Sequence, residues 1–251
     1  MQFPFDFGPG EGPDANSSLV SRLSAVLAAA RRTAVYGPPI ARAEAQTPER
    51  VLARLPPVRI HSYLENREQF RNPKAPAAKA RPEHGDPGAI CGSLEELLRL
   101  AARVVAGEAA PPATVRRLTV RTPLGERLAS ERARDYLWRA FELPVFEELA
   151  GSEGEVFAAE CEAHSGLHLE TESAIFEALY GELVVTSLVA VRYPIIRLRT
   201  GWVGAIERCA CPCGERVTRF VPVLVATGAL RKPPAPARTG HRAADRAAAA
   251  V

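Results

Sequence analysis

The sequence predicts an α/β fold in which a strand–helix–strand unit is followed by a mostly antiparallel β segment. A β-type run at 118–121, a helical pattern over 130–141 and a second β-type run at 143–146 follow one another, which is the order of strands joined by a helical crossover. After Gly151, six further β-type runs are separated by Gly, Pro or polar turns, as in antiparallel sheets. These runs are Val156–Cys161, Leu167–Glu170, Ala174–Glu177, Leu183–Leu188, Ile195–Arg199 and Val217–Val225. A chain of 251 residues, 47% of them hydrophobic, can bury a core as one large domain or two small ones.

The chain before this unit is predicted to be helical. Residues 1–18 are rich in Gly, Pro, Asn and Ser, and we expect them to be disordered. Apolar residues recur at helical spacing from Leu19 onward and predict an amphipathic helix that ends near Arg32. A short second helix is expected at 48–55, so that residues 19–71 form an N-terminal helical segment.

A linker and a well-capped helix come next. Residues 72–90 include the run NPKAPAAKARPEHGDP, which can continue neither a helix nor a strand for long. Ser93, with Glu96 three residues later, forms a capping box, and the helix that it starts is expected to end at Gly107. We therefore expect the α/β and β core to span residues 91–228.

The positive charge of the chain lies in its last residues. The net charge is +3, but residues 231–251 carry five basic residues and one acidic residue, which leaves 27 basic against 28 acidic residues elsewhere. We expect 229–251 to be a disordered basic tail, and the nearly neutral remainder does not favour nucleic-acid binding. No apolar run approaches the ~20 residues of a membrane span, and the first residues do not resemble a signal peptide. A cytoplasmic protein is expected, and the sequence leaves the oligomeric state open.

Two sequence blocks resemble one enzyme family. The stretch 142–168, ELPVFEELAGSEGEVFAAECEAHSGLH, and the stretch 181–214, GELVVTSLVAVRYPIIRLRTGWVGAIERCACPCG, are similar to the phenylacetate–CoA ligase branch of the adenylate-forming (AMP-binding) enzymes. The resemblance covers about residues 93–225 and implies a partial adenylate-forming N-terminal domain. If activity is retained, the resemblance implies an AMP-forming acid–CoA ligase that uses ATP with Mg²⁺ and CoA.

Several nucleotide-binding features of that family are missing here. A linker at 72–90 stands where the family has a Ser/Thr/Gly-rich loop that holds the ATP phosphates. By the resemblance, the adenine-stacking aromatic is lost at 149–150, and the ribose-binding Asp is replaced by Trp202, which cannot accept hydrogen bonds. The small C-terminal domain with its catalytic Lys is expected to be absent. The pair Ser152 and Glu153 remains as a residual Mg/ATP turn, because the family's carboxylate at this position binds Mg²⁺.

These departures favour a protein that does not adenylate an acid by itself. Loss of one group that stabilises the transition state typically costs ~10²–10³-fold in rate, and several such groups are expected to be missing together. We predict a degenerate ligase homologue with a binding or assembly role, and we assign no catalytic residue. One alternative is an acyl- or aryl-CoA ligase that is active only with a partner protein supplying the nucleotide lobe. Another is a zinc-stabilised interaction module.

The cysteines predict a metal site rather than a set of disulfides. The five cysteines are Cys91, Cys161, Cys209, Cys211 and Cys213, an odd number. Cys211 and Cys213 lie on one predicted hairpin. Cys161 and His168 lie on another, and the four side chains together would give a tetrahedral site for structural Zn²⁺, as a subset of the resembled family has. His164 is the alternative fourth ligand; His168 is preferred because it returns on the opposite strand. In the competing interpretation, Cys161 is a buried apolar residue and the other thiols are reduced surface groups.

Overall fold

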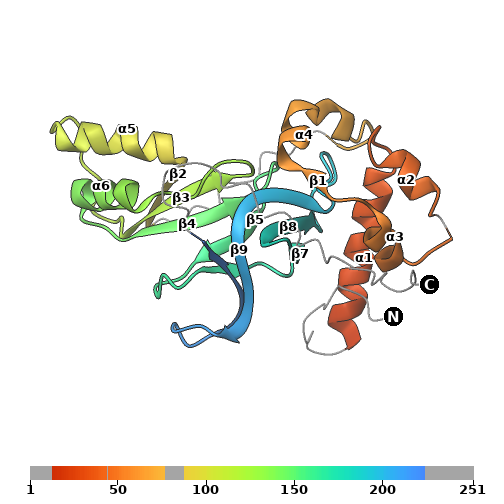
Figure 1. The fold of residues 1–251 in the computed structure, drawn as a ribbon. Coiled ribbons are helices and arrows are strands. Elements are labelled where there is room, and N and C mark those ends of the chain that lie inside the picture. Colours follow the sequence, from red (N-terminus) through yellow and green to blue (C-terminus); the bar gives the residue numbers. More distant parts are fainter. Residues whose placement is uncertain (1–12, 44, 77–87, 224–251) are drawn as a thin grey trace, which may run out of the picture.

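The computed structural model describes residues 13–43, 45–76 and 88–223. Residues 1–12, most of the predicted linker and the predicted tail at 229–251 lie outside these described residues. The predicted α/β class is confirmed. Figure 1 shows a large sheet with one group of helices at each end of the molecule.

The helices and strands alternate much as predicted. The helices are α1 (Pro13–Ala30), α2 (Gly37–Ala41), α3 (Pro48–Arg54), α4 (Ile60–Glu65), α5 (Leu94–Val105) and α6 (Glu131–Phe141), with a 3₁₀ turn η1 (Arg67–Phe70). The first strands are β1 (Val58–Arg59), β2 (Ala89–Gly92), β3 (Arg117–Pro123), β4 (Val145–Ala150) and β5 (Val156–Glu160). The remaining strands are β6 (Leu167–Leu169), β7 (Ala174–Leu179), β8 (Glu182–Ser187), β9 (Leu198–Ala210) and β10 (Arg216–Pro222). Among the described residues, no helix is both long and apolar enough to cross a membrane.

The sheet changes from parallel to antiparallel where the sequence predicts it. The strand order is β2-β3-β4-β5-β6-β10-β9-β8-β7, and β1 pairs with β9. Strands β2, β3 and β4 are parallel and are joined by α5 and α6, which lie side by side in Figure 1. From β4 onward, each neighbouring pair along this order is antiparallel. The strand–helix–strand unit therefore continues into a hairpin sheet without a break.

Capping side chains start both helices of the parallel part. The Ser93 hydroxyl accepts the backbone N–H of Glu96 at 3.3 Å, and the Glu96 carboxylate accepts the backbone N–H of Ser93 at 2.8 Å, which confirms the capping box. Ser130 caps α6 in the same way through the N–H of Ala133. Helix α6 ends at Phe141, and the C-cap residue Glu142, with a φ of 54°, turns the chain. Strand β4 therefore begins two residues later than the run predicted at 143–146.

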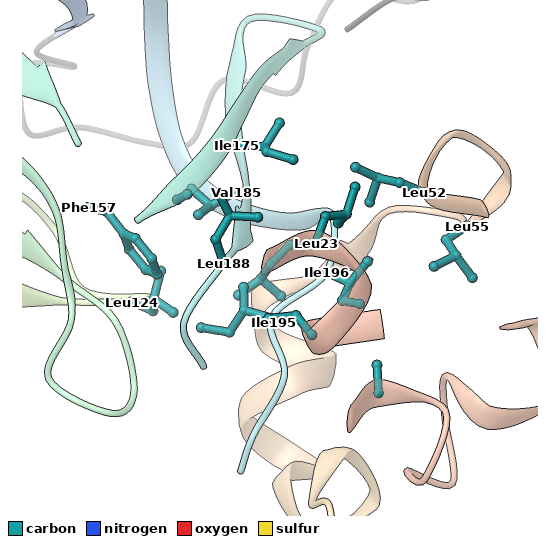
Figure 2. Close-up of a cluster of buried hydrophobic side chains, with 14 of the residues drawn as sticks. Leu23, Leu52, Leu55, Leu124, Phe157, Ile175, Val185, Leu188, Ile195 and Ile196 are labelled. Carbon is teal, nitrogen blue, oxygen red and sulfur yellow. The ribbon is translucent and has the colours of Figure 1, made fainter. Parts of the chain in front are cut away.

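The N-terminal helices pack on the antiparallel part of the sheet and do not form a separate core. In Figure 2, Leu23 of α1 and Leu52 of α3 lie beside apolar side chains of the sheet. Both leucines are fully buried. The other labelled cluster residues include Phe157, Ile175 and Val185 in strands, and Leu124, Leu188, Ile195 and Ile196 in segments that adjoin strands. One large apolar cluster therefore fixes the helical segment to the sheet.

Two segment boundaries differ from the predicted ones. Helix α1 begins at Pro13 rather than at Leu19, because Pro is favourable at the first helical position, where its missing N–H needs no acceptor. The Asn and Ser residues that follow Pro13 have low helix propensity and hid this first turn in the sequence. Strand β2 begins at Ala89, inside the range 72–90 that was predicted to be linker, and pairs with β3.

Strand β9 is much longer than the run predicted at 195–199. Two glycines within it, Gly201 and Gly204, resemble strand breakers in the sequence. A Cβ atom on Gly204 would lie 2.3 Å from the carbonyl oxygen of Val221, so glycine allows the close approach of β10 at this point. The strand therefore continues for 13 residues and carries the chain to the cysteine-rich turn.

Candidate functional site

Two hairpins bring three thiols and one imidazole together. Cys161 directly follows β5 and His168 lies in β6, whereas Cys211 and Cys213 lie in the turn between β9 and β10. The four ligand atoms all lie within 4.8 Å of one another. The Sγ atoms of Cys161 and Cys211 are 3.6 Å apart, and Cys213 Sγ is 3.8 Å from His168 Nε2. Three sulfur atoms and one nitrogen in such a group are a donor set that could hold a tetrahedral metal ion.

Strand pairing explains why these side chains meet. In β6 and β10, His168 lies opposite Arg219, so the two hairpins are neighbours in one sheet. The β9–β10 turn is closed by a hydrogen bond from the Cys211 N–H to the Glu215 carbonyl at 2.8 Å, and Gly214 supplies a φ of 98°. This tight turn brings the thiols of Cys211 and Cys213 into one group with Cys161 and His168.

The surroundings favour the metal-binding forms of His168 and Cys211 but not that of Cys161. His168 turns Nε2 toward the thiols, and its Nδ1 lies 3.6 Å from a carboxylate oxygen of Glu215. A carboxylate behind a ligating histidine fixes the orientation of the ring in metal sites. The backbone N–H of Cys213 lowers the pKa of the Cys211 thiol to about 6, whereas burial raises the pKa of Cys161. Glu215 carried no signal in the sequence, because its contact depends on how the turn folds.

His164 and Cys91 lie outside this group. The His164 ring stacks on Phe146 with centroids 4.9 Å apart, and its Nδ1 is 3.4 Å from a carboxylate oxygen of Glu160. His164 lies in the turn before β6 with a φ of 46°, and its ring is not part of the group formed by the three thiols and His168. Cys91 lies in β2, at the far edge of the sheet. Of the two histidines considered from the sequence, the structure brings only His168 to the cysteines.

The turn at Ser152 and Glu153 is held by internal hydrogen bonds. One carboxylate oxygen of Glu153 accepts the backbone N–H groups of Arg192 and Tyr193 at 3.0 and 2.8 Å. The Ser152 hydroxyl is 3.2 Å from the hydroxyl of Tyr63 in α4, and burial raises the pKa of Tyr63 to about 12. The turn thus connects the N-terminal helices to the segment before β9.

Trp202, which the resemblance places where the family has its ribose-binding Asp, is packed inside the protein. The Trp202 side chain lies in the main apolar cluster, and the residue is only 5% exposed. Its indole N–H donates to the Glu126 carbonyl at 2.8 Å. Leu149 and Ala150, where the resemblance predicts the loss of an adenine-stacking aromatic, are buried as well. The sequence predicts that these residues replace nucleotide-binding groups, and in the structure all three side chains are packed.

A cavity of about 590 Å³ lies between α6 and the two hairpins of the cysteine group. Its walls include Arg134, which binds Glu147 and Glu160 at 3.0 and 2.8 Å. Glu147 also accepts the Thr122 hydroxyl and the Ala129 N–H. These buried charges have partners within the protein, so they hold α6 against β4 and β5.

Comparisons with known proteins identify the fold of this chain. No protein-family model matches the sequence, and no curated protein is similar to it. Two crystal structures of 2-hydroxyisobutyryl-CoA ligase are similar to this chain. One holds 2-HIB-AMP and CoA in the thioesterification state, and the other holds R3-HIB-AMP in the postadenylation state. Their TM-scores are 0.56 and 0.58, at 14% sequence identity, and each match covers 88% of this chain and 73% of the other.

A third structure of that ligase matches over a smaller region. It is an open conformation with 2-HIB-AMP and CoA, with a TM-score of 0.44 and 19% identity, and the match covers 54% of this chain. This chain spans 32% of the chain in that structure. The two matches with higher scores show that the described residues share the fold of an adenylate-forming acyl-CoA ligase.

Proposed function

We propose that this chain is a homologue of the phenylacetate–CoA ligases that has a binding or assembly role and forms no acyl adenylate by itself. The observation that carries the proposal is that Glu153 and Trp202, which the resemblance places at nucleotide-binding positions, form hydrogen bonds within the protein. Glu153 accepts two backbone N–H groups, and the Trp202 side chain is buried with its N–H bonded to Glu126. One carboxylate oxygen of Glu153 is thus occupied by backbone donors, and Trp202 offers no acceptor for a ribose hydroxyl.

Glu153 would have to change partners to bind Mg²⁺ through the same oxygen. Moving it would leave the N–H groups of Arg192 and Tyr193 without their acceptor, at a cost of about 1–3 kcal/mol for each one that stays buried. Trp202 has a single donor and no acceptor, so it cannot replace a carboxylate that binds two ribose hydroxyls. The contacts of both residues therefore stabilise the folded protein and do not suit them to nucleotide binding.

The test is ATP–pyrophosphate exchange with the purified full chain and a panel of aromatic and aliphatic acids. We expect no exchange above the rate of a buffer blank, and no heat of ATP·Mg²⁺ binding by calorimetry. An active acid–CoA ligase in parallel reactions shows that the assay works. Exchange with any acid would overturn the proposal.

The same proposal includes one structural Zn²⁺ per chain, held by the two hairpins. The ligands would be Cys161, His168, Cys211 and Cys213, whose donor atoms fit Zn²⁺ in type, number and spacing. Zinc would supply cross-linking of the two hairpins and no hydrolytic chemistry, because four protein ligands leave no open position. Free thiols of this kind are typical of a reducing compartment, which supports a cytoplasmic location.

Metal analysis and a chelator test the zinc site. We expect about one equivalent of zinc and a drop of many degrees in melting temperature when a strong chelator removes it, because binding energy at such a site is folding energy. Cys213→Ser should destabilise the protein in the same way, whereas Cys91→Ser, which is remote from the group, should not. Zinc far below one equivalent, together with an unchanged Cys213→Ser variant, would remove the metal from the proposal.

A second function, ligation with a partner that supplies the nucleotide lobe, is favoured by the sheet edge at β2. Among the described residues, β2 pairs on one side only, and its sequence, AICG, carries no charge. Natural sheets usually protect an edge with charged residues or cover it. If a gene beside this one encodes a complementary lobe, the two purified proteins together should catalyse pyrophosphate exchange that neither catalyses alone. A stable complex without exchange would leave only the assembly role.

A further inference from the structure

A buried arginine lies against the cysteine group and is not one of its four candidate ligands. Arg219, in β10, is 5% exposed. Its Nη2 atom is 3.1 Å from Cys209 Sγ and 3.0 Å from a carboxylate oxygen of Glu207. Its Nη1 atom is 3.7 Å from Cys211 Sγ and 2.8 Å from the carbonyl oxygen of Ser165. One guanidinium group therefore contacts two thiols, a carboxylate and the neighbouring turn.

The strand register places Arg219 between the two hairpins. It lies opposite His168 across β6 and β10, and opposite Glu207 across β9 and β10. Through Ser165 it holds the turn of the β5–β6 hairpin, and through Cys209 and Cys211 it holds the end of the β9–β10 hairpin. The planar guanidinium suits this bridging position, since its donors are fixed in direction.

Charge gives the same residue a second role. Three thiolates and a neutral imidazole around Zn²⁺ leave a net charge of −1, and a buried charge without a partner is costly. Arg219 brings the opposite charge to the Cys211 ligand from within the protein. The side chain of Glu207, the acidic partner of Arg219, is 43% exposed. Solvent therefore screens the negative charge of Glu207 more than the positive charge of the buried guanidinium.

We propose that Arg219 is a positioning residue of the metal centre, which aligns the two hairpins and donates a hydrogen bond to the Cys211 thiolate. This inference rests on the proposed zinc site. Groups behind the ligands typically change metal affinity 10–100-fold when they are removed. A hydrogen bond to a metal-bound thiolate also withdraws electron density from sulfur, so its loss should change the electronic spectrum of the site.

The experiment replaces zinc by Co²⁺, whose thiolate charge-transfer bands report on the sulfur ligands. The apo full chain and its Arg219→Gln and Arg219→Lys variants are titrated with Co²⁺, and Zn²⁺ affinity is then measured by competition with a chromophoric chelator. The control is Arg216→Gln, because Arg216 is an exposed arginine at the start of the same strand. Circular dichroism of each metal-loaded variant shows whether it folds.

We expect Arg219→Gln to bind Zn²⁺ about 10–100-fold more weakly than the wild type, and its Co²⁺ charge-transfer band to move to longer wavelength. Arg219→Lys, which keeps the charge but not the fork of donors, should lie between the two in affinity and in band position. Arg216→Gln should match the wild type. If Arg219 only formed a structural ion pair with Glu207, Arg219→Gln would alter the stability of the protein without moving the Co²⁺ charge-transfer band.

The outcomes separate the two proposals. If the wild type binds neither Co²⁺ nor Zn²⁺ at this group, the zinc site itself fails. If the wild type binds both metals and Arg219→Gln gives the affinity and the spectrum of Arg216→Gln, the site stands and the role of Arg219 is refuted. If Arg219→Gln does not fold with excess metal, Arg219→Lys decides, and an unshifted band in that variant also refutes the role.

Discussion

Replacement of Trp202 by alanine should cost this protein a large part of its stability. The Trp202 side chain is part of the main apolar cluster, and the residue is 5% exposed. Truncation of a buried aromatic side chain to alanine typically costs about 3–5 kcal/mol, because apolar contacts are lost and a cavity remains. The Glu126 carbonyl also loses its donor, although Glu126 is exposed and water can replace the indole N–H. We therefore keep about 3–5 kcal/mol as the expected loss.

The loss should be visible in urea and in thermal unfolding of the metal-loaded protein. For a chain of this size, 1 kcal/mol corresponds to about 2–4 °C in melting temperature, so Trp202→Ala should lower it by about 6–20 °C. The matched control is Trp138, the other tryptophan of the chain, which is 54% exposed on α6. Trp138→Ala should change the free energy of unfolding by less than about 1 kcal/mol.

The same pair of variants reports on the environment of Trp202 directly. Trp138→Ala leaves Trp202 as the only indole, and we expect blue-shifted emission that resists quenching by acrylamide. The packing argument is refuted if Trp202→Ala loses less than about 1 kcal/mol, or if the remaining indole emits as it would in water. Trp202→Asp, which restores the acidic residue of the resembled family, should destabilise the protein and should not create ATP binding.

Three further predictions concern other parts of the chain. Glu153→Ala should lower the free energy of unfolding by about 2–4 kcal/mol, because two backbone N–H groups lose their acceptor. The control Glu108→Ala, at an exposed residue, should have no measurable effect. Equal stability of the two variants in urea would contradict this prediction. Deletion of residues 231–251 should leave the melting temperature within about two degrees, as for an unordered terminus, and a drop of many degrees would show that the predicted boundary of the tail is wrong. Burial raises the pKa of Tyr63 from 10.0 to about 12, so the folded state keeps this proton where the unfolded chain loses it, and stability should fall as pH rises through this interval. Tyr63→Phe should flatten that fall without removing it, because burial also raises the pKa of Tyr36, and an unchanged slope in alkaline denaturation would refute the assignment.

The sequence by itself determined where most helices and strands lie and the order in which they follow one another. Period-2 and helical patterns located α5, α6 and most of the strands, and the change after Gly151 marked the start of the antiparallel part. The capping box at Ser93 needed only a local spacing of three residues. The close spacing of Cys211 and Cys213 in the sequence likewise predicted that both thiols lie on one hairpin. These features depend on residues near one another in the chain, and a single sequence contains all of that information.

The tertiary structure decided which of these side chains meet. The choice of His168 over His164 depends on the register of β6 against β10, two strands about fifty residues apart in the sequence. The role of Arg219 depends on the same register. The internal use of Glu153 depends on a loop about forty residues away. Such contacts follow from strand pairing and from closure of one apolar core, which are non-local. A local pattern can therefore name the candidate ligands of this site, but their partners are fixed only when the hairpins pack together.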